Sequence, residues 1–535
     1  MKKNSFMQGA FIATCGIVLS KILGMLYVIP FYSIIGDQGG ALYGYAYSIY
    51  SIFLGMSQAG IPMAISKIIS EYNVLGYYNA KERSFKLGRK TLMILGILCF
   101  IIMFVFAKPL SYVIIGNVSG GNTREDVTFV IRVISTAILV VPLLSIYRGF
   151  LQGNKYITPT SISQVLEQIV RVIIIIAGSY LSLKVFHLSL TTAVGIAVFS
   201  ATVGALCSYF YLLVKANKNK KQLYKRTLKV SEPKISDQDI IKKILFYAFP
   251  FIMIDVFKSL INSVDVFTLV PVLVNGLGYT AAQAEAIMGV ISTWGLKINM
   301  IIASIATGLM VSLIPNLTAS FVKKDMEDVR NKINHTLQWL LFFTVPMTIG
   351  LSILAKPVWT IFYGVSEFGP SVYQYYVFVA LVTTLFTAAI TILQLLKEYK
   401  MVFIALFSGL IVNASLNVPL LYAFDRMGLP AYYGSTTSTI LGYSSCVIIS
   451  LWYIHKKYQV NYEDTVKKVI SVVMTTMVMT IVLLLLQRIF PFDSTNRLFS
   501  IFYVSVYAIL GSLIYFFIAF QSKLIYEVFG KDNIM

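Results

Sequence analysis

Four positively charged side chains lie deep inside long apolar stretches of the sequence: Lys21, Arg171, Lys258 and Lys297. A charged side chain at the centre of a bilayer costs roughly 2.5–3.5 kcal/mol, so such groups usually face a bundle interior or a water-filled cavity. Lysine and arginine make charge-assisted hydrogen bonds with phosphate oxygens. The four cations therefore form a candidate binding site for a strongly anionic group such as a diphosphate.

A polar stripe accompanies Arg171 on its own predicted helix. At 100° per residue, Gln164, Glu167, Gln168 and Arg171 fall within about 100° of one another, whereas the opposite face carries Ile, Val and Leu. This helix follows a predicted short polar connection at 148–156. We expect the stripe to face a polar cavity.

A second polar face lies in the apolar segment 244–272. Asp255, Lys258, Asn262 and Asp265 fall within about 80° of one another on a helix. We expect this face and the stripe to supply polar partners and switch residues to the same cavity.

Two pairs of opposite charges in these helices have two interpretations. Glu167 and Arg171 are four residues apart, and Asp255 and Lys258 are three apart, so each pair could be a structural ion pair. Each could equally be a switch that opens when an anionic ligand competes for the cation. Both interpretations stay open at this point.

The segments that position these residues are predicted membrane spans. Hydrophobic residues make up 57% of the chain and charged residues only 13%, which is typical of an all-α polytopic membrane protein. About 20 apolar residues cross a bilayer as a helix. The sequence predicts fourteen such spans, at approximately 6–35, 41–66, 90–115, 127–149, 159–182, 190–214, 244–272, 287–317, 334–355, 372–396, 401–422, 432–454, 468–490 and 497–520.

The distribution of basic residues predicts the orientation of these spans. With the N-terminus in the cytoplasm, the inside segments hold 32 of the 44 lysines and arginines and the outside segments hold 7. This bias indicates that both termini are cytoplasmic. Because the net charge of +21 is scattered over short inside loops, it indicates attraction to anionic membrane lipids and does not predict nucleic-acid binding.

An internal repeat predicts the domain organisation. Residues 107–116 and 355–364 both begin Ala-Lys-Pro and end in Gly, 248 residues apart, and Ile61-Pro62 is echoed by Ile314-Pro315. We therefore expect two six-helix lobes related by a parallel repeat, about an axis along the membrane normal. The predicted parts are lobes at 1–214 and 244–456, a basic cytoplasmic linker at 215–243, and two additional spans within 457–535.

Several kinds of catalytic and metal chemistry have no motif in this sequence. It contains no G-x-x-x-x-G-K-[ST] phosphate loop, no H-E-x-x-H and no G-x-S-x-G motif. Its four cysteines show no paired spacing, and its three histidines lie near span ends. We therefore expect no catalytic residues, no metal site and no cofactor.

The stretch around the polar stripe carries a resemblance to a known family. Tyr-Arg-Gly-Phe-Leu-Gln-Gly at 147–153, Pro159-Thr160, and the Ser-Gln-Val and Glu-Gln groups that follow closely resemble the polysaccharide-biosynthesis group of Gram-positive bacteria. That group contains SpoVB-like proteins and MurJ-type lipid II flippases, within the multidrug/oligosaccharidyl-lipid/polysaccharide exporter superfamily. Ser20-Lys21-x-x-Gly24 is similar to a first-helix motif of the family, although Tyr27 stands where many Gram-negative members have arginine.

This resemblance implies a function. It implies a flippase that moves undecaprenyl-diphosphate-linked peptidoglycan precursor, lipid II, across the plasma membrane of a bacterium by alternating access, with the last two helices as walls of a lipid groove. Alternatives are a flippase for a teichoic, capsular or sporulation-specific glycan, or a drug or cation antiporter. The expected partners are the lipid-linked glycan and membrane lipids, with cell-wall synthesis enzymes as candidates. Coupling to the membrane potential or to a cation gradient stays open.

Overall fold

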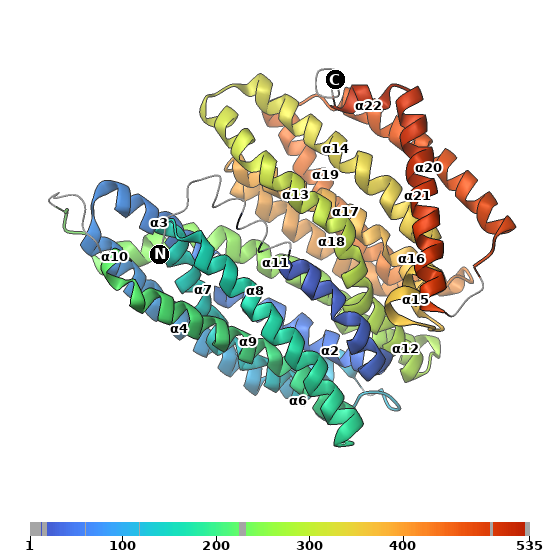
Figure 1. The fold of residues 1–535 in the computed structure, drawn as a ribbon, viewed down its shortest axis with the longest axis horizontal. Helices are drawn as coiled ribbons and strands as arrows, with labels where there is room; N and C mark the ends of the chain where they lie inside the picture. The colour runs from blue at the N-terminus through green and yellow to red at the C-terminus, as the bar shows by residue number, and fades with distance from the viewer. Residues whose placement is uncertain are drawn as a thin grey trace. The chain divides into compact units, whose positions relative to one another are not determined.

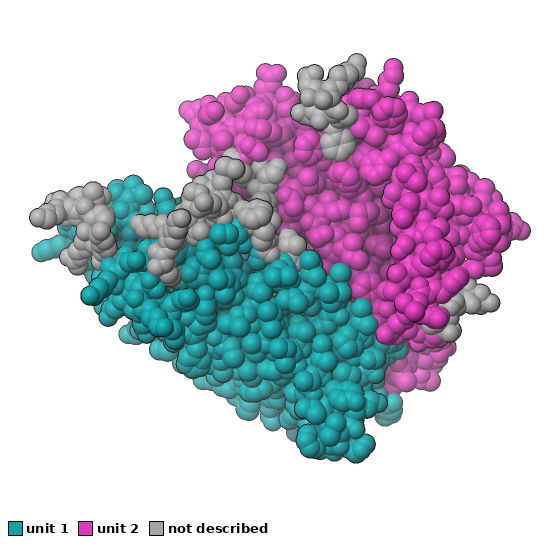
Figure 2. All heavy atoms as spheres, viewed as in Figure 1, with its two compact units in different colours: residues 1–267 teal, residues 268–535 magenta. Residues whose placement is uncertain are grey.

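The structure is a computed structural model that describes residues 12, 16, 19–58, 60–116, 118–223, 232–492 and 496–529. The beginning of the first predicted span, residues 224–231 of the predicted linker and the last six residues lie outside this description. Within the described ranges every regular element is a helix. The chain groups into two compact units, residues 1–267 and 268–535, which Figure 2 colours separately.

The prediction of fourteen spans is confirmed. Thirteen helical stretches of the described chain are long and apolar enough to cross a membrane, and the first of them, Val28–Leu75, contains the end of the first predicted span and all of the second. Gly36 separates these parts because its φ of 63° and ψ of −163° interrupt the helix. That region of backbone conformation is essentially restricted to glycine.

Unit 1 contains the helices from the N-terminus to the first part of α11 (Figure 1). Residues 19–26 are helical and precede the elements whose bounds follow. They are α2 (Val28–Gln58), α3 (Ile61–Leu75), α4 (Tyr78–Val105), α5 (Ala107–Ile115), α6 (Arg124–Ser135), α7 (Ala137–Gly153), α8 (Ile157–Ile173), the π-helical turns η1 (Ile174–Gly178) and η2 (Leu181–Val185), α9 (Leu190–Lys218), α10 (Lys220–Leu223) and α11 (Asp237–Leu277).

The predicted polar connection at 148–156 is largely wrong, because α7 continues to Gly153. Gly149 and Gly153 place this end of α7 directly against α3. A Cβ atom on Gly149 would lie 2.5 Å from the Pro62 carbonyl oxygen, and one on Gly153 would lie 2.6 Å from the Ser66 carbonyl oxygen. Small residues spaced four apart allow helices in membranes to approach this closely.

Unit 2 contains the remaining helices, whose bounds follow. They are α12 (Ala281–Gly289), the π-helical turn η3 (Val290–Trp294), α13 (Gly295–Val322), α14 (Met326–Ile353), α15 (Ala355–Tyr363), α16 (Gly369–Tyr376), α17 (Phe378–Leu395), α18 (Tyr399–Arg426), α19 (Tyr432–Tyr458), α20 (Glu463–Ile489), α21 (Arg497–Gln521) and α22 (Leu524–Phe529). The two additional spans are α20 and α21, which pack against α14 and α15 respectively.

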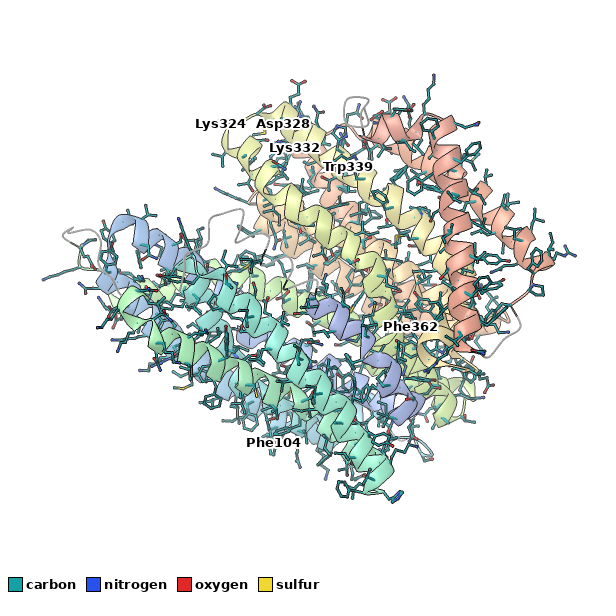
Figure 3. All side chains as sticks on the ribbon, in the orientation of Figure 1. Phe104, Lys324, Asp328, Lys332, Trp339 and Phe362 are labelled. Atoms are coloured by element: carbon teal, nitrogen blue, oxygen red, sulfur yellow. The ribbon has the colours of Figure 1, made fainter. Side chains whose placement is uncertain are left out.

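Polar side chains fix the end of α14 where it follows α13. Lys324, Asp328 and Lys332 gather at this turn in Figure 3, and the Lys332 ammonium donates to Asp328 at 2.5 Å and to the Ser320 hydroxyl at 2.6 Å. Two turns further along α14, the Trp339 indole donates to the Val528 carbonyl of α22 at 2.8 Å. The last described helix is thereby anchored to α14.

The helices that carry the sequence repeat break at matching places. Both α5 and α15 are nine-residue helices that continue a long helix after a kink, and both end at a glycine with positive φ, 65° at Gly116 and 79° at Gly364. The following helices are also broken, at Thr136 and at Val377. The second echo is less regular: the chain breaks at Gly60 before Ile61, whereas α13 runs unbroken through residues 314 and 315. The repeat axis and the predicted lobe boundaries stay predictions.

The end of the predicted linker is bound to α4. The Glu232 carboxylate accepts hydrogen bonds from the backbone amides of Asn79 and Ala80, at 2.9 and 3.2 Å, and so caps the first turn of that helix. Arg83 of α4 forms an ion pair with Asp237, the first residue of α11. Residues 232–237 thus fix where α11 begins.

Glu398, between α17 and α18, provides a pH-dependent contact in unit 2. Its carboxylate accepts from Lys457 at 2.5 Å, Tyr458 at 2.6 Å and Tyr453 at 2.7 Å. Burial raises the pKa of Glu398, but these three hydrogen bonds outweigh burial and hold its pKa below the usual value. The charged carboxylate therefore joins the α17–α18 turn to the end of α19.

We expect Glu398→Gln to lower the stability of the folded protein at neutral pH by about 1 kcal/mol. Because the folded-state pKa is depressed, this contribution is present above the unfolded pKa of about 4.3 and is lost as the pH falls through the lower folded value. Melting temperatures in detergent should therefore differ between wild type and variant from pH 7 to pH 5, and the difference should begin to shrink below about pH 4.3 and vanish below the folded-state pKa. A gap that widens on acidification would contradict this assignment.

Candidate functional site

The predicted polar stripe lies on α8 and faces neighbouring helices of unit 1. Gln164, Glu167, Gln168 and Arg171 are all half-buried. A Cβ on Gly24 would lie 3.3 Å from the Gln168 side-chain nitrogen, so the glycine of the Ser20-Lys21-x-x-Gly24 motif allows the helix at 19–26 to approach the stripe. α9 packs against α8 as well (Figure 1), and it does so at the stripe itself: a Cβ on Gly204 of α9 would lie 2.8 Å from the Glu167 carbonyl oxygen.

Glu167 pairs with an arginine that we did not predict as a site residue. Its carboxylate accepts from Arg148 of α7 at 2.8 Å, and the same guanidinium donates to the Ser163 hydroxyl at 2.9 Å. Both charged side chains are largely buried, with 16% and 20% of their surfaces exposed. The ion pair that Glu167 forms is therefore with Arg148, and of the two open interpretations the structural Glu167–Arg171 pair is not the one seen among the described residues.

A sequence signal for this pair existed. Arg148 stands six residues before the turn at 154–156 and Ser163 seven residues after it, so an antiparallel α7–α8 hairpin places them near one another. The prediction of a loop at 148–156 hid this register.

Arg171 has a different environment, formed by tyrosines. Its guanidinium donates to the Tyr47 hydroxyl at 2.5 Å, with its central carbon 5.2 Å from the centre of the Tyr47 ring. Tyr27, Tyr43 and Tyr50 lie within electrostatic range of the same group. Among the described residues, no carboxylate oxygen lies within 4 Å of Arg171. Neutral groups therefore position this side chain, and its positive charge is not neutralised by an ion pair.

The predicted polar face of α11 is only partly exposed. Asp255, Lys258 and Asn262 are exposed, whereas Asp265 is buried, with 3% of its surface accessible. Asp255 lies within electrostatic range of Lys258, and within the described ranges the two form no ion pair closer than 4 Å. The α11 backbone at Asp255 passes against Gly55 of α2, where a Cβ would lie 3.4 Å away.

Two of the predicted cations lie near one another in unit 1. Lys21, half-buried on the helix at 19–26, is within electrostatic range of Lys258. Two like charges at short range repel each other, and a multivalent anion between them removes that repulsion. The arrangement suits binding of an anion.

The profile of one protein family matches more than half of this chain. The family is described as polysaccharide biosynthesis protein, and the match covers residues 6–315. The chain belongs to this polysaccharide biosynthesis family. The matched range contains all the predicted site residues.

Individual relatives cover nearly the whole chain or about two thirds of it. Lipid II flippase MurJ of Bacillus subtilis (strain 168) is 30% identical over 99% of this chain and 97% of its own length. Stage V sporulation protein B of the same organism is 22% identical over 68% of each chain. These relatives and the thirteen membrane-compatible stretches of the described chain identify a multi-pass integral protein of the bacterial plasma membrane.

Solved structures show the same fold. Lipid II flippase MurJ in an inward closed conformation has a TM-score of 0.67 at 15% identity, covering 96% of this chain and 99% of that one. An inward-facing multidrug resistance MATE transporter has a TM-score of 0.62 at 12% identity, covering 84% and 98%. The family member described here is accordingly a transporter and not an enzyme.

The fourth predicted cation belongs to the other unit. Lys297 lies near the start of α13 in unit 2 and is half-buried. Lys21, Arg171 and Lys258 belong to unit 1. The common cavity that the sequence predicts for all four cations stays a prediction.

Proposed function

We propose that this chain is a flippase that moves undecaprenyl-diphosphate-linked peptidoglycan precursor, lipid II, from the inner to the outer leaflet. The observation that carries this proposal is the 30% identity to the lipid II flippase of Bacillus subtilis over 99% of the chain. Lys21, Arg171, Lys258 and Lys297 bind the diphosphate, and Gln164, Gln168 and Asn262 line the path of the polar head. Translocation proceeds by alternating access, without nucleotide hydrolysis.

An apolar cavity in unit 2 supports a lipid-linked substrate. Its volume is about 380 Å³, and α14, α20 and α21 supply most of its walls. Phe342, Pro346, Met479, Leu483 and Phe516 are among its lining residues. The lining suits a polyprenyl chain, which stays in apolar surroundings while its head crosses.

The proposed orientation places both termini and the linker in the cytoplasm. We expect a single cysteine at Lys220, in a protein whose four native cysteines are replaced, to react with a membrane-impermeant maleimide only after the cells are opened. The physical reason is the 32-to-7 distribution of basic residues. A cysteine at Lys356, predicted to lie outside, is the matched control and should react in intact cells. The reverse labelling pattern would overturn the orientation.

A reconstituted flipping assay tests the function. Purified protein in proteoliposomes should expose fluorescent lipid II to an impermeant quencher faster than empty liposomes do. Parallel vesicles with a teichoic-acid precursor, a capsular precursor or a cationic drug test the alternative substrates. Vesicles with and without an imposed membrane potential test coupling. Movement of another glycan but not lipid II would replace the substrate, and movement of the drug alone would overturn the flippase assignment.

A further inference from the structure

The two arginines of the α7–α8 hairpin, Arg148 and Arg171, have different hydrogen-bond partners. Arg148 is neutralised by Glu167 at 2.8 Å, whereas Arg171 donates its hydrogen bond to the phenol of Tyr47. Arg171 belongs to the polar stripe and Arg148 contacts it, yet only Arg148 has a carboxylate partner among the described residues. This difference indicates different roles for the two side chains.

A phenol holds a guanidinium without cancelling its charge. The free tyrosine hydroxyl ionises only near pH 10, so Tyr47 accepts from Arg171 as a neutral group. A guanidinium has five N–H donors, and a single acceptor occupies one of them. Arg171 can therefore be fixed by Tyr47 and still present a full positive charge and further donors to an anion.

Tyr47 is itself held in place by an aromatic row on α2. Its ring centre lies 4.4 Å from that of Tyr43 and 5.8 Å from that of Tyr50, at helical spacings of four and three residues. Tyr43 packs against Phe31 at 5.3 Å. Tyr43 and Tyr50 are buried, with 4% and 6% of their surfaces exposed, whereas Tyr47 is half-buried where it meets Arg171. The row thus orients one hydroxyl toward the guanidinium.

Without the Tyr47 hydroxyl, Arg171 has a nearby alternative. Glu167 lies one helical turn earlier on α8, at the i−4 position from which a carboxylate can reach an arginine. Glu167 also lies within electrostatic range of Tyr50, in the same row. The loss of one hydroxyl would allow Arg171 to turn toward Glu167 and share its negative charge.

We infer that Tyr47 is a positioning residue that fixes Arg171 through its hydroxyl and so keeps the positive charge of Arg171 available to a diphosphate head group. This inference rests on the proposed function, because it assigns Tyr47 a part in the recognition of that head group. It also distinguishes two tyrosines of one row: the Tyr47 hydroxyl accepts a hydrogen bond from Arg171, whereas Tyr50 lies within electrostatic range of Arg171 and forms no such bond among the described residues.

The test compares Tyr47→Phe with its matched control Tyr50→Phe, each removing one hydroxyl from the same row. The probe is undecaprenyl diphosphate, whose dissociation constant is measured on the full-length protein in detergent. We expect Tyr47→Phe to weaken binding on the order of tenfold, the loss of one hydrogen bond to a charged group, and Tyr50→Phe to leave it unchanged. In the flipping assay Tyr47→Phe should raise the half-saturating concentration more than it lowers the maximal rate.

A double-mutant cycle distinguishes positioning from a general effect on folding. In an Arg171→Ala background, Tyr47→Phe should cause no further loss, because its target is gone. Melting temperatures within a few degrees of wild type establish that both single variants are folded. Equal binding by Tyr47→Phe and wild type, or an equal loss in both backgrounds, overturns the role of Tyr47 alone. A wild-type protein that binds no undecaprenyl diphosphate and flips no lipid-linked sugar overturns the proposed function as well.

Discussion

Replacing Lys21 by alanine is expected to abolish growth of a cell that depends on this protein for flipping. Lys21 is half-buried in a membrane helix and lies within electrostatic range of Lys258, so it is one of two cations suited to hold the same anion. Alanine removes the charge, whereas arginine keeps it and changes only the shape of the hydrogen bonding. Lys21→Arg should therefore retain part of the activity. Complementation of a flippase-depleted strain measures both variants, with protein amounts checked by immunoblot.

A matched control for this experiment is Lys108→Ala. Lys108 is an exposed lysine in the first turn of α5, outside the predicted site, so its loss should not affect growth. Normal growth of the Lys21→Ala strain at normal protein levels would show that Lys21 is not needed for the substrate, and the proposed anion site would have to be built without it.

Breaking the Arg148–Glu167 pair is expected to destabilise the folded protein strongly. Glu167→Gln leaves the Arg148 charge without its carboxylate in a position where only 16% of that side chain is exposed. Removal of one partner from a fully buried pair costs about 3–5 kcal/mol, and residual solvent access reduces this to about 1–3 kcal/mol here. Thermal unfolding in detergent should show a clear decrease in melting temperature.

Two comparisons test the cause of that decrease. Glu463→Gln removes one partner of the exposed Glu463–Lys467 pair, whose side chains are 66% and 70% exposed, and should change stability by less than about 1 kcal/mol. Removing both charges with Arg148→Gln and Glu167→Gln should cost less than the sum of the single changes. Additive losses would mean that the two side chains stabilise the fold independently.

The sequence predicted the membrane spans well because each is an apolar run bounded by polar residues. It misplaced the end of α7 because Arg148, Gly149 and Gln152 look like a loop in isolation. In the folded chain Gly149 is a contact with α3, and Arg148 is neutralised from α8. Both are contacts between different helices, so the residue pattern of a single segment does not reveal them.

The charged residues of the candidate site could be predicted from the sequence, but the ion pairs that they form could not. Lys21, Arg171 and Lys258 stood out because a charge in an apolar run demands an explanation. The choice between Arg148 and Arg171 as partner of Glu167 depends on the register of two packed helices, which i and i+4 spacing cannot give. Tyr47 was not predicted because tyrosines at helical spacing usually only pack.

The chain segments that precede and follow residues 224–231 are each bound to α3 or α4. These contacts bear on whether the protein could assemble from two separate polypeptides. Before that segment, buried Lys81 donates to the Leu223 carbonyl at 3.0 Å; after it, Glu232 caps α4. Further along α11, Lys243 pairs with Glu71 of α3 at 2.7 Å. Each side is thus held to the α3–α4 turn by its own contacts. If the gene were split within codons 224–231, the two polypeptides would still carry complementary contact surfaces. We expect such a split transporter to reassemble through these contacts.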